Sequence, residues 1–210
     1  MSDDARRFAP ATARNRQPIL EVLQRVLPAE GTVLEVASGT GEHAAFFTPR
    51  LPEGLRWQPT EAESEALAGI DAHARESGCA RILPAVRLDA AAEDWPVDEA
   101  AAVFCCNMIH IAPWAAAEGL FAGAGRLLPP GAPLVLYGPF KREGQHTAPS
   151  NEAFDKSLHE RDSRWGVRCL DEDVTPLAAR TGFELDEIAL MPANNLTLVF
   201  RKGVTGRRGG

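Results

Sequence analysis

The sequence predicts an α/β fold in which helices cover both faces of a doubly wound, mostly parallel sheet of seven strands. Short β-branched or apolar runs alternate with amphipathic segments along most of the 210 residues, and this alternation is typical of parallel sheets covered by helices. One early strand leads through a glycine turn directly into a helix. Near the C-terminus, turn-forming residues join two strands, which indicates an antiparallel hairpin that closes the sheet.

The first half of the chain contains three of the strands and the helices between them. Residues 1–16 form a polar lead-in to a single domain that spans 17–202. Pro18, a residue type favoured at the start of helices, opens the first helix, and Pro28 and Gly31 end it. The patterns that follow predict strands at 32–36, 55–59 and 82–86 and helices at 42–48 and 64–76.

The second half of the chain supplies the remaining four strands. We expect Asp171 to be the N-cap of the last helix and Gly182 to end it. Residues 138–170 show no regular pattern apart from a short helix at 151–161, and a long insert of this kind is typical of a lid or binding loop. The glycine- and arginine-rich tail, 203–210, is expected to be disordered. The strands are predicted at 101–106, 134–137, 183–190 and 196–200, and the helices at 113–128 and 171–180.

Composition and charge narrow the classes of molecule that the protein is expected to bind. The 22 basic and 29 acidic side chains give a formal charge of -7, which disfavours a broad nucleic-acid or anionic-lipid surface. The sequence shows no signal-type run and no apolar stretch of membrane-spanning length. The four cysteines have no metal-binding or disulfide spacing. We therefore expect a cytoplasmic protein with reduced thiols, no metal, no nucleic acid and no membrane partner.

The glycine turn is the clearest candidate binding site. It reads Glu35-Val36-Ala37-Ser38-Gly39-Thr40-Gly41, where a strand's carboxyl end meets a helix. Open parallel sheets bind ligands at this position, and glycine lets the backbone approach a ligand closely. The segment from Gly39 to Ala44 also fits the dinucleotide pattern G-x-G-x-x-A, so a nicotinamide or flavin enzyme remains open at this point.

The run from Leu34 to Gly41 resembles the first motif of class I S-adenosylmethionine-dependent methyltransferases, which have a Rossmann-like fold. The resemblance implies that Glu35 lies near the methionine moiety of the cofactor, whereas a dinucleotide fold normally has an apolar residue there. The resemblance also implies that Glu61 accepts hydrogen bonds from the ribose hydroxyls and that Asp89 contacts the adenine amino group. Asn107 matches the end of the fourth strand, which in this class often lies beside the methyl-transfer site. The C-terminal hairpin also favours methyl transfer over hydride transfer.

Further motifs resemble an uncharacterised methyltransferase-like family of unknown function over nearly all of residues 14–202. One departure from the class motif is Ala37, which stands where the first glycine is usual and suggests a less open turn. Arg14 and Asn15 precede the first helix, which in this fold commonly closes over the cofactor. The family-like motifs are Asn107-Met108-Ile109-His110, Tyr137-Gly138-Pro139-Phe140, His146-Thr147-Ala148-Pro149-Ser150-Asn151 and Pro192-Ala193-Asn194-Asn195-Leu196-Thr197.

Four aromatic or imidazole side chains are candidates for the acceptor side of the site. His110 follows the fourth strand and can act as a general base, since a neutral imidazole accepts protons near pH 7; a hydrogen-bonded structural histidine is the equal alternative. His146, in the insert, is a weaker candidate for the same chemistry. Trp114 and Tyr137 can line a substrate pocket or belong to the core.

The sequence therefore predicts an enzyme that transfers a methyl group from S-adenosylmethionine to an acceptor, with a small molecule as the expected partner. The absence of a visible nucleophile triad fits this chemistry, because the sulfonium leaving group is already activated. Two other functions stay open. One is a catalytically silent S-adenosylmethionine-binding interaction module, and the other is a nucleotide-dependent oxidoreductase, which Glu35 and the hairpin disfavour.

Overall fold

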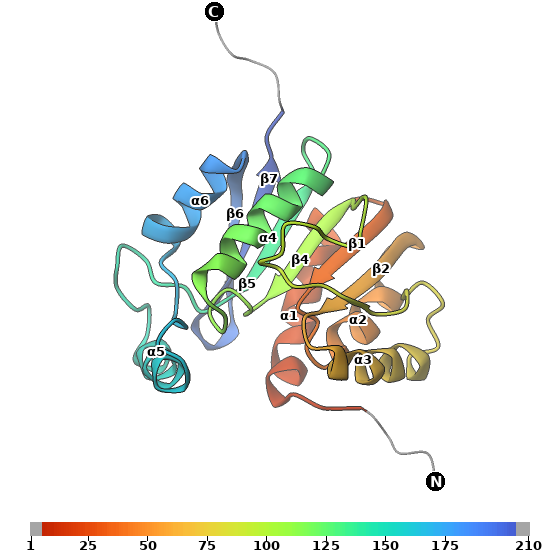
Figure 1. Ribbon diagram of the computed structural model, residues 1–210, viewed down its shortest axis with the longest axis horizontal. Helices are drawn as coiled ribbons and strands as arrows, with labels where there is room; N and C mark the ends of the chain where they lie inside the picture. The colour runs from red at the N-terminus through yellow and green to blue at the C-terminus, as the bar shows by residue number, and fades with distance from the viewer. Residues whose placement is uncertain (1–5, 205–210) are drawn as a thin grey trace, which may run out of the picture.

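The predicted strands form one seven-stranded sheet in the order β3-β2-β1-β4-β5-β7-β6. The computed structural model describes residues 6–204 (Figure 1). Strands β1 to β5 run parallel, and β7 lies antiparallel between β5 and β6. The doubly wound sheet and its closing hairpin are thus confirmed. The strands are β1 Glu30–Val36, β2 Gly54–Glu61, β3 Val86–Arg87, β4 Ala102–Cys106, β5 Pro133–Gly138, β6 Phe183–Met191 and β7 Asn195–Lys202.

Helices cover both faces because apolar residues of the central strands alternate between two hydrophobic cores. In β1, Val33 faces the core formed with α1 and α2, whereas Leu34 faces the core formed with α4 and α6. Helices α4 and α6 lie in front of the sheet in Figure 1. The helices are α1 Pro10–Val26, α2 Glu42–Phe47, α3 Ser64–Glu76, α4 Trp114–Leu127, α5 Pro149–Arg161 and α6 Thr175–Arg180.

The first helix begins earlier than the sequence predicts. It starts at Pro10, and Pro18 lies inside it. Proline 18 has no N–H for the carbonyl of residue 14, but the helix continues because Ile19, Leu20 and Leu23 are buried against the sheet. Burial of the apolar face therefore outweighs one lost hydrogen bond. Much of the expected polar lead-in is helical and belongs to the folded structure.

Two further local predictions are wrong. The third strand is only Val86–Arg87, and Ile82 pairs with Trp57 as an isolated bridge. Asp171 is not the N-cap of the last helix: its carboxylate instead accepts hydrogen bonds from Arg142 and from the backbone N–H of Glu143. A π-helical turn at Leu170–Val174 precedes α6. Gly182, with φ +80°, ends α6 as predicted.

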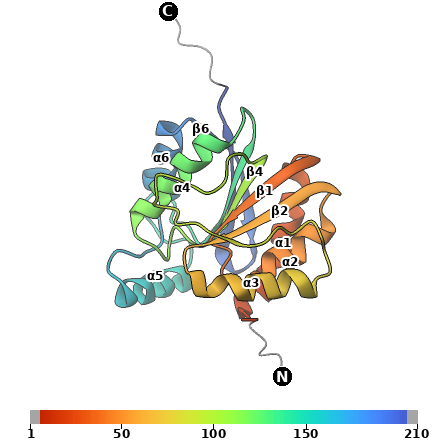
Figure 2. The ribbon, with the colours of Figure 1, turned by 45° about the vertical axis from the view of Figure 1, so that its right-hand side comes forward.

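The insert after β5 lies at one end of the molecule. Its helix α5 and the helix α3 appear at the same lower end in Figures 1 and 2. Within residues 6–204, no helix has the length and apolar character needed to cross a bilayer. Of the tail that was expected to be disordered, only Gly203 and Val204 are among the described residues.

Candidate active site

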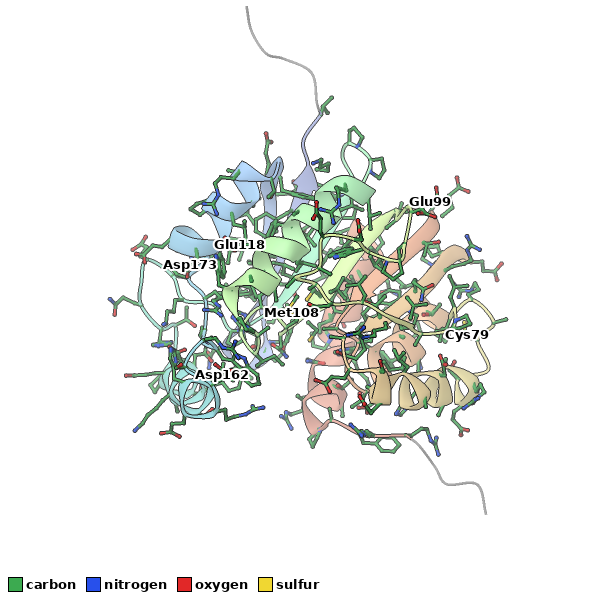
Figure 3. All side chains as sticks on the ribbon, in the orientation of Figure 1. Cys79, Glu99, Met108, Glu118, Asp162 and Asp173 are labelled. Carbon is green, nitrogen blue, oxygen red and sulfur yellow. The ribbon has the colours of Figure 1, made fainter. Side chains whose placement is uncertain are left out.

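A cavity of about 530 Å³ opens at the carboxyl ends of β1, β2 and β4. The turn after β1 forms one wall, the residues after β2 and β3 form another, and α1 and the insert contribute the remainder. Met108, which follows β4, lines the cavity and lies near the centre of Figure 3. Seven of the nine predicted cofactor residues line it: Ala37, Ser38, Gly39, Thr40, Glu61, Asp89 and Asn107.

The two glycines of the turn have different roles. Gly39 has φ +59°, and a Cβ added there would meet no atom within 4 Å. Because Gly39 lines the cavity, that space is available to a ligand. Gly41 has φ +85°, does not line the cavity, and an added Cβ would lie 2.7 Å from the Ile70 Cα. Gly41 therefore allows α2 and α3 to pack closely, and Gly39 is the residue that leaves room for a ligand.

The two acids downstream lie in the cavity wall with their carboxylates held by backbone amides. Glu61 Oε2 accepts the Gly39 N–H at 2.8 Å, and its Oε1 accepts the Ala62 N–H at 2.8 Å. Asp89 Oδ1 accepts the Ala91 N–H at 2.9 Å. Each carboxylate retains lone pairs that can accept further hydrogen bonds from hydroxyl or amino groups of a ligand.

Glu35 does not line the cavity, although it was predicted as a cofactor-binding residue. Its side chain is buried, and Oε2 accepts hydrogen bonds from Trp57 Nε1 and Ser38 Oγ, both at 2.9 Å. Burial raises the pKa of Glu35 to about 7. The partner that offsets its desolvation therefore comes from the protein, and Glu35 supports the turn through Ser38.

A hydrogen-bonded series connects α2 with β5. His43 Nε2 lies 2.9 Å from Asn15 Oδ1, and Asn15 also bonds to Tyr137. Burial lowers the pKa of His43 to about 4, so its imidazole is neutral at pH 7. His43 and Asn15 line the cavity of about 530 Å³. Tyr137 lines a second cavity of about 460 Å³, which shares Ala11, Asn15 and Asn107 with the first.

His110 lies outside both cavities and is fully buried. Its Nδ1 accepts the Arg168 N–H at 3.2 Å, and its carbonyl accepts the Gly166 N–H at 2.9 Å. Burial lowers the pKa of His110 to about 3. The lone pair of Nδ1 is occupied, and neither cavity reaches the ring. The geometry therefore supports a hydrogen-bonded structural histidine, which connects the insert to the loop after β4.

The other two acceptor-side candidates also lie away from the described cavities. His146 Nε2 is 3.1 Å from Asp155 Oδ2, inside the insert. Trp114 packs against the core, with the Arg168 guanidinium 5.5 Å from its ring centroid. Neither residue lines either cavity, so Tyr137 is the one predicted substrate-pocket residue that lies in a cavity wall.

Several wall residues were not predicted from the sequence. Thr12 was assigned to the polar lead-in, although Pro10 is a usable helix-start signal. Met108 and Ile111 lie in an irregular loop after β4, and Trp165 comes from the insert. No periodic pattern marks residues of this kind, because tertiary packing alone brings them to the cavity.

One family model matches this chain, and solved structures share its architecture. A model of a family described as "Protein of unknown function (DUF938)" matches residues 6–202. CalO1, a methyltransferase in calicheamicin biosynthesis solved with S-adenosylhomocysteine bound, aligns with TM-score 0.72 and 20% identity over 92% of this chain and 54% of CalO1. Mitomycin 7-O-methyltransferase MmcR aligns with TM-score 0.77 and 15% identity over 92% and 54% of the two chains.

A third solved structure is aligned over nearly all of its own length. Protein BH2331 from Bacillus halodurans C-125 aligns with TM-score 0.68 and 18% identity over 89% of this chain and 98% of its own. The chain thus spans about half the length of CalO1 and MmcR, at 54% of each. At these identities the structures establish the fold, and the family model covers almost the entire chain. The protein therefore has the fold of class I S-adenosylmethionine-dependent methyltransferases and belongs to the DUF938 family.

Proposed function

We propose that this protein binds S-adenosylmethionine in the cavity of about 530 Å³ and transfers its methyl group to a small molecule. The observation that carries the proposal is the open space above Gly39, flanked by Glu61 and Asp89 at successive strand ends. A ligand that lies across the carboxyl ends of these strands would meet all three residues.

The cavity wall fits an adenosyl ligand. Glu61, held by two backbone amides, would accept hydrogen bonds from ribose hydroxyls, and the second oxygen of Asp89 would accept one from the adenine amino group. Asn15 and His43 would lie toward the methionine end, beside α1. Apolar atoms of Met108 and Ile111, which line the cavity, would pack against a purine ring.

The chain's contribution to the reaction is binding and alignment. S-adenosylmethionine would supply an activated sulfonium methyl group to an acceptor lone pair, with the electrons of the C–S bond left on sulfur, and an acceptor that ionises readily would have lost its proton to solvent before it binds. Enclosure by α1 and Trp165 would hold the acceptor in line and exclude solvent. No general base on His110 is needed for an acceptor that ionises readily.

The closing hairpin further disfavours a dinucleotide oxidoreductase, because β7 lies antiparallel between β5 and β6. A catalytically silent binding module remains the second candidate, and one observation favours it: the predicted base, His110, is sealed from both cavities. The two candidates differ in turnover and not in cofactor binding.

Transfer of labelled methyl groups tests the proposal. The purified protein, S-adenosylmethionine with a labelled methyl group and a low-molecular-mass lysate fraction should yield a labelled product. Glu61→Ala should reduce labelling about tenfold, because loss of charged hydrogen bonds to ribose weakens cofactor binding. Glu65→Ala is the matched control, since Glu65 is exposed on α3 and does not line the cavity.

The possible outcomes separate the two candidates. Labelling by the wild type that Glu61→Ala lowers and Glu65→Ala leaves intact would support the enzyme. Cofactor binding without labelling of any fraction would identify a silent module, and equal labelling by the wild type and Glu61→Ala would contradict the assigned site.

A further inference from the structure

The second cavity, of about 460 Å³, lies between the start of α1, the end of β5, α5 and the β6–β7 turn. We propose that it binds a small acceptor bearing a carboxylate, which Arg14 recognises. The inference rests on the proposed function, because the cavity shares Ala11, Asn15 and Asn107 with the cofactor cavity. A molecule in the second cavity would therefore reach a ligand in the first.

The charge of the second cavity points to an anion. Arg14 is the only ionised side chain among the described residues that line it, and neither aspartate nor glutamate is present in this wall. Within residues 6–204, Arg14 forms no ion pair and no side-chain hydrogen bond. A guanidinium without a carboxylate partner binds a carboxylate of a ligand through two parallel N–H bonds. One guanidinium balances a single negative charge, which fits a monoanion better than a phosphate dianion.

The hydroxyl groups of the wall add donors of the same kind. Burial raises the pKa of Tyr137 to about 12, so the phenol keeps its proton, and the hydrogen bond from Asn15 leaves the O–H free to donate. Ser150 Oγ lies 3.5 Å from Asn194 Nδ2 and accepts from it, which also leaves its O–H free. A carboxylate accepts from O–H and guanidinium groups together.

Two asparagines of the wall are arranged as acceptors. Asn151 Nδ2 donates to Thr147 Oγ1 at 3.0 Å and to the Asn194 carbonyl at 2.9 Å. Asn195 Nδ2 donates to the carbonyls of Pro192 and Ala193, both at 3.2 Å. Since both amide nitrogens are used within the protein, the side-chain oxygens remain for a hydroxyl of the ligand.

Backbone strain supports a functional role for this cavity. Asn107, Ala193 and Asn194 have φ of 62°, 56° and 58°, a region that costs energy for residues other than glycine. Asn107 and Ala193 line the cavity, and the carbonyl of Asn194 is held by Asn151. Phe154, Pro139 and Pro192 complete the wall with flat apolar surface. The site therefore fits a small ring that carries a hydroxyl and a carboxylate.

Binding of a matched pair of probes tests the proposal without turnover. The probes are 3-hydroxybenzoate and its neutral analogue 3-hydroxybenzamide, titrated calorimetrically into the full chain with and without S-adenosylhomocysteine. The wild type should bind the acid at least about tenfold more tightly than the amide, because a charged hydrogen bond replaces a neutral one. Arg14→Gln should weaken binding of the acid about tenfold and leave the amide and S-adenosylhomocysteine unchanged.

Arg16→Gln is the matched control, because Arg16 lies on the same helix but over the Phe46 ring at 4.4 Å, outside this cavity. It should bind the acid as the wild type does. Equal binding of acid and amide by the wild type, including binding of neither, would overturn the inference, as would unchanged acid binding by Arg14→Gln. Absence of S-adenosylhomocysteine binding alongside a preserved acid preference would instead contradict the proposed function.

Discussion

Ala37 has φ +60°, a left-handed conformation that glycine adopts at lower energy. Left-handed backbone costs an alanine about 1–2 kcal/mol, whereas the greater freedom of glycine in the unfolded chain offsets about 0.4–1 kcal/mol. Ala37→Gly should therefore raise the free energy of unfolding by about 0.5 kcal/mol, measured by urea denaturation. Gly41→Ala should lower it, because the new Cβ would meet Ile70. Lower stability of Ala37→Gly would contradict the assigned conformation.

Glu35 makes stability depend on pH. Its pKa is raised by burial from 4.5 to about 7, so between these values the native state holds a proton that the unfolded state has lost. Stability should fall as pH rises through this window, by about 3 kcal/mol in total. Glu35→Gln keeps an oxygen for Trp57 and Ser38 but does not ionise, so its stability relative to wild type should increase from pH 5 to pH 8. Denaturant titrations at both pH values measure the difference, and a constant difference would contradict the burial of an ionisable group.

At the scale of elements, Asp155 on α5 connects α5 to the segments of the insert that precede and follow it. Its carboxylate accepts the Val167 N–H and the Lys141 ammonium at 2.7 and 2.8 Å. Burial raises its pKa, but hydrogen bonds from Lys141 and Val167 more than offset this, so the pKa is lowered overall. Asp155→Asn should destabilise the protein by about 2 kcal/mol and speed hydrogen exchange at the Val167 amide.

Glu160→Gln provides the control for that change, since Glu160 is exposed on the same helix, α5. Its exchange pattern should match that of the wild type. Unchanged exchange at Val167 in Asp155→Asn would show that the insert is held by other contacts.

The predicted elements differ from the observed ones where tertiary packing overrides a local signal. Pro18 reads as a helix start, yet burial of Ile19 and Leu20 carries the helix through it from Pro10. Asp171 reads as a helix cap, but Arg142 pairs with its carboxylate, 29 residues away in sequence. Strands β1, β4 and β5 were predictable because each is a short apolar run buried on both faces.

At the scale of the whole molecule, the cofactor cavity and the second cavity differ in how far the sequence predicts them. In the cofactor cavity, Glu61 is the last residue of β2, whereas Gly39 and Asp89 follow β1 and β3, and parallel strands end at one edge of the sheet. The second cavity combines α1, β5, α5 and the hairpin turn, segments far apart in the chain. Their meeting depends on side-chain packing, which no local pattern encodes.

The most direct test of the central claim is calorimetric titration of S-adenosylhomocysteine into the wild type, Gly39→Ala and Gly78→Ala. Gly78 is the matched control, since it also has positive φ, +65°, and open space around an added Cβ, but it does not line the cofactor cavity. Both variants should lose similar stability, about 0.5 kcal/mol, because the left-handed strain of alanine exceeds the unfolded-state freedom that it removes.

Gly39→Ala alone should weaken binding, about tenfold, because its methyl group would occupy space that the ligand needs. We expect binding by the wild type and Gly78→Ala, weakened binding by Gly39→Ala, and no comparable binding of a nicotinamide dinucleotide. Failure of the wild type to bind S-adenosylhomocysteine, or equal affinity of Gly39→Ala and wild type, would contradict the central claim.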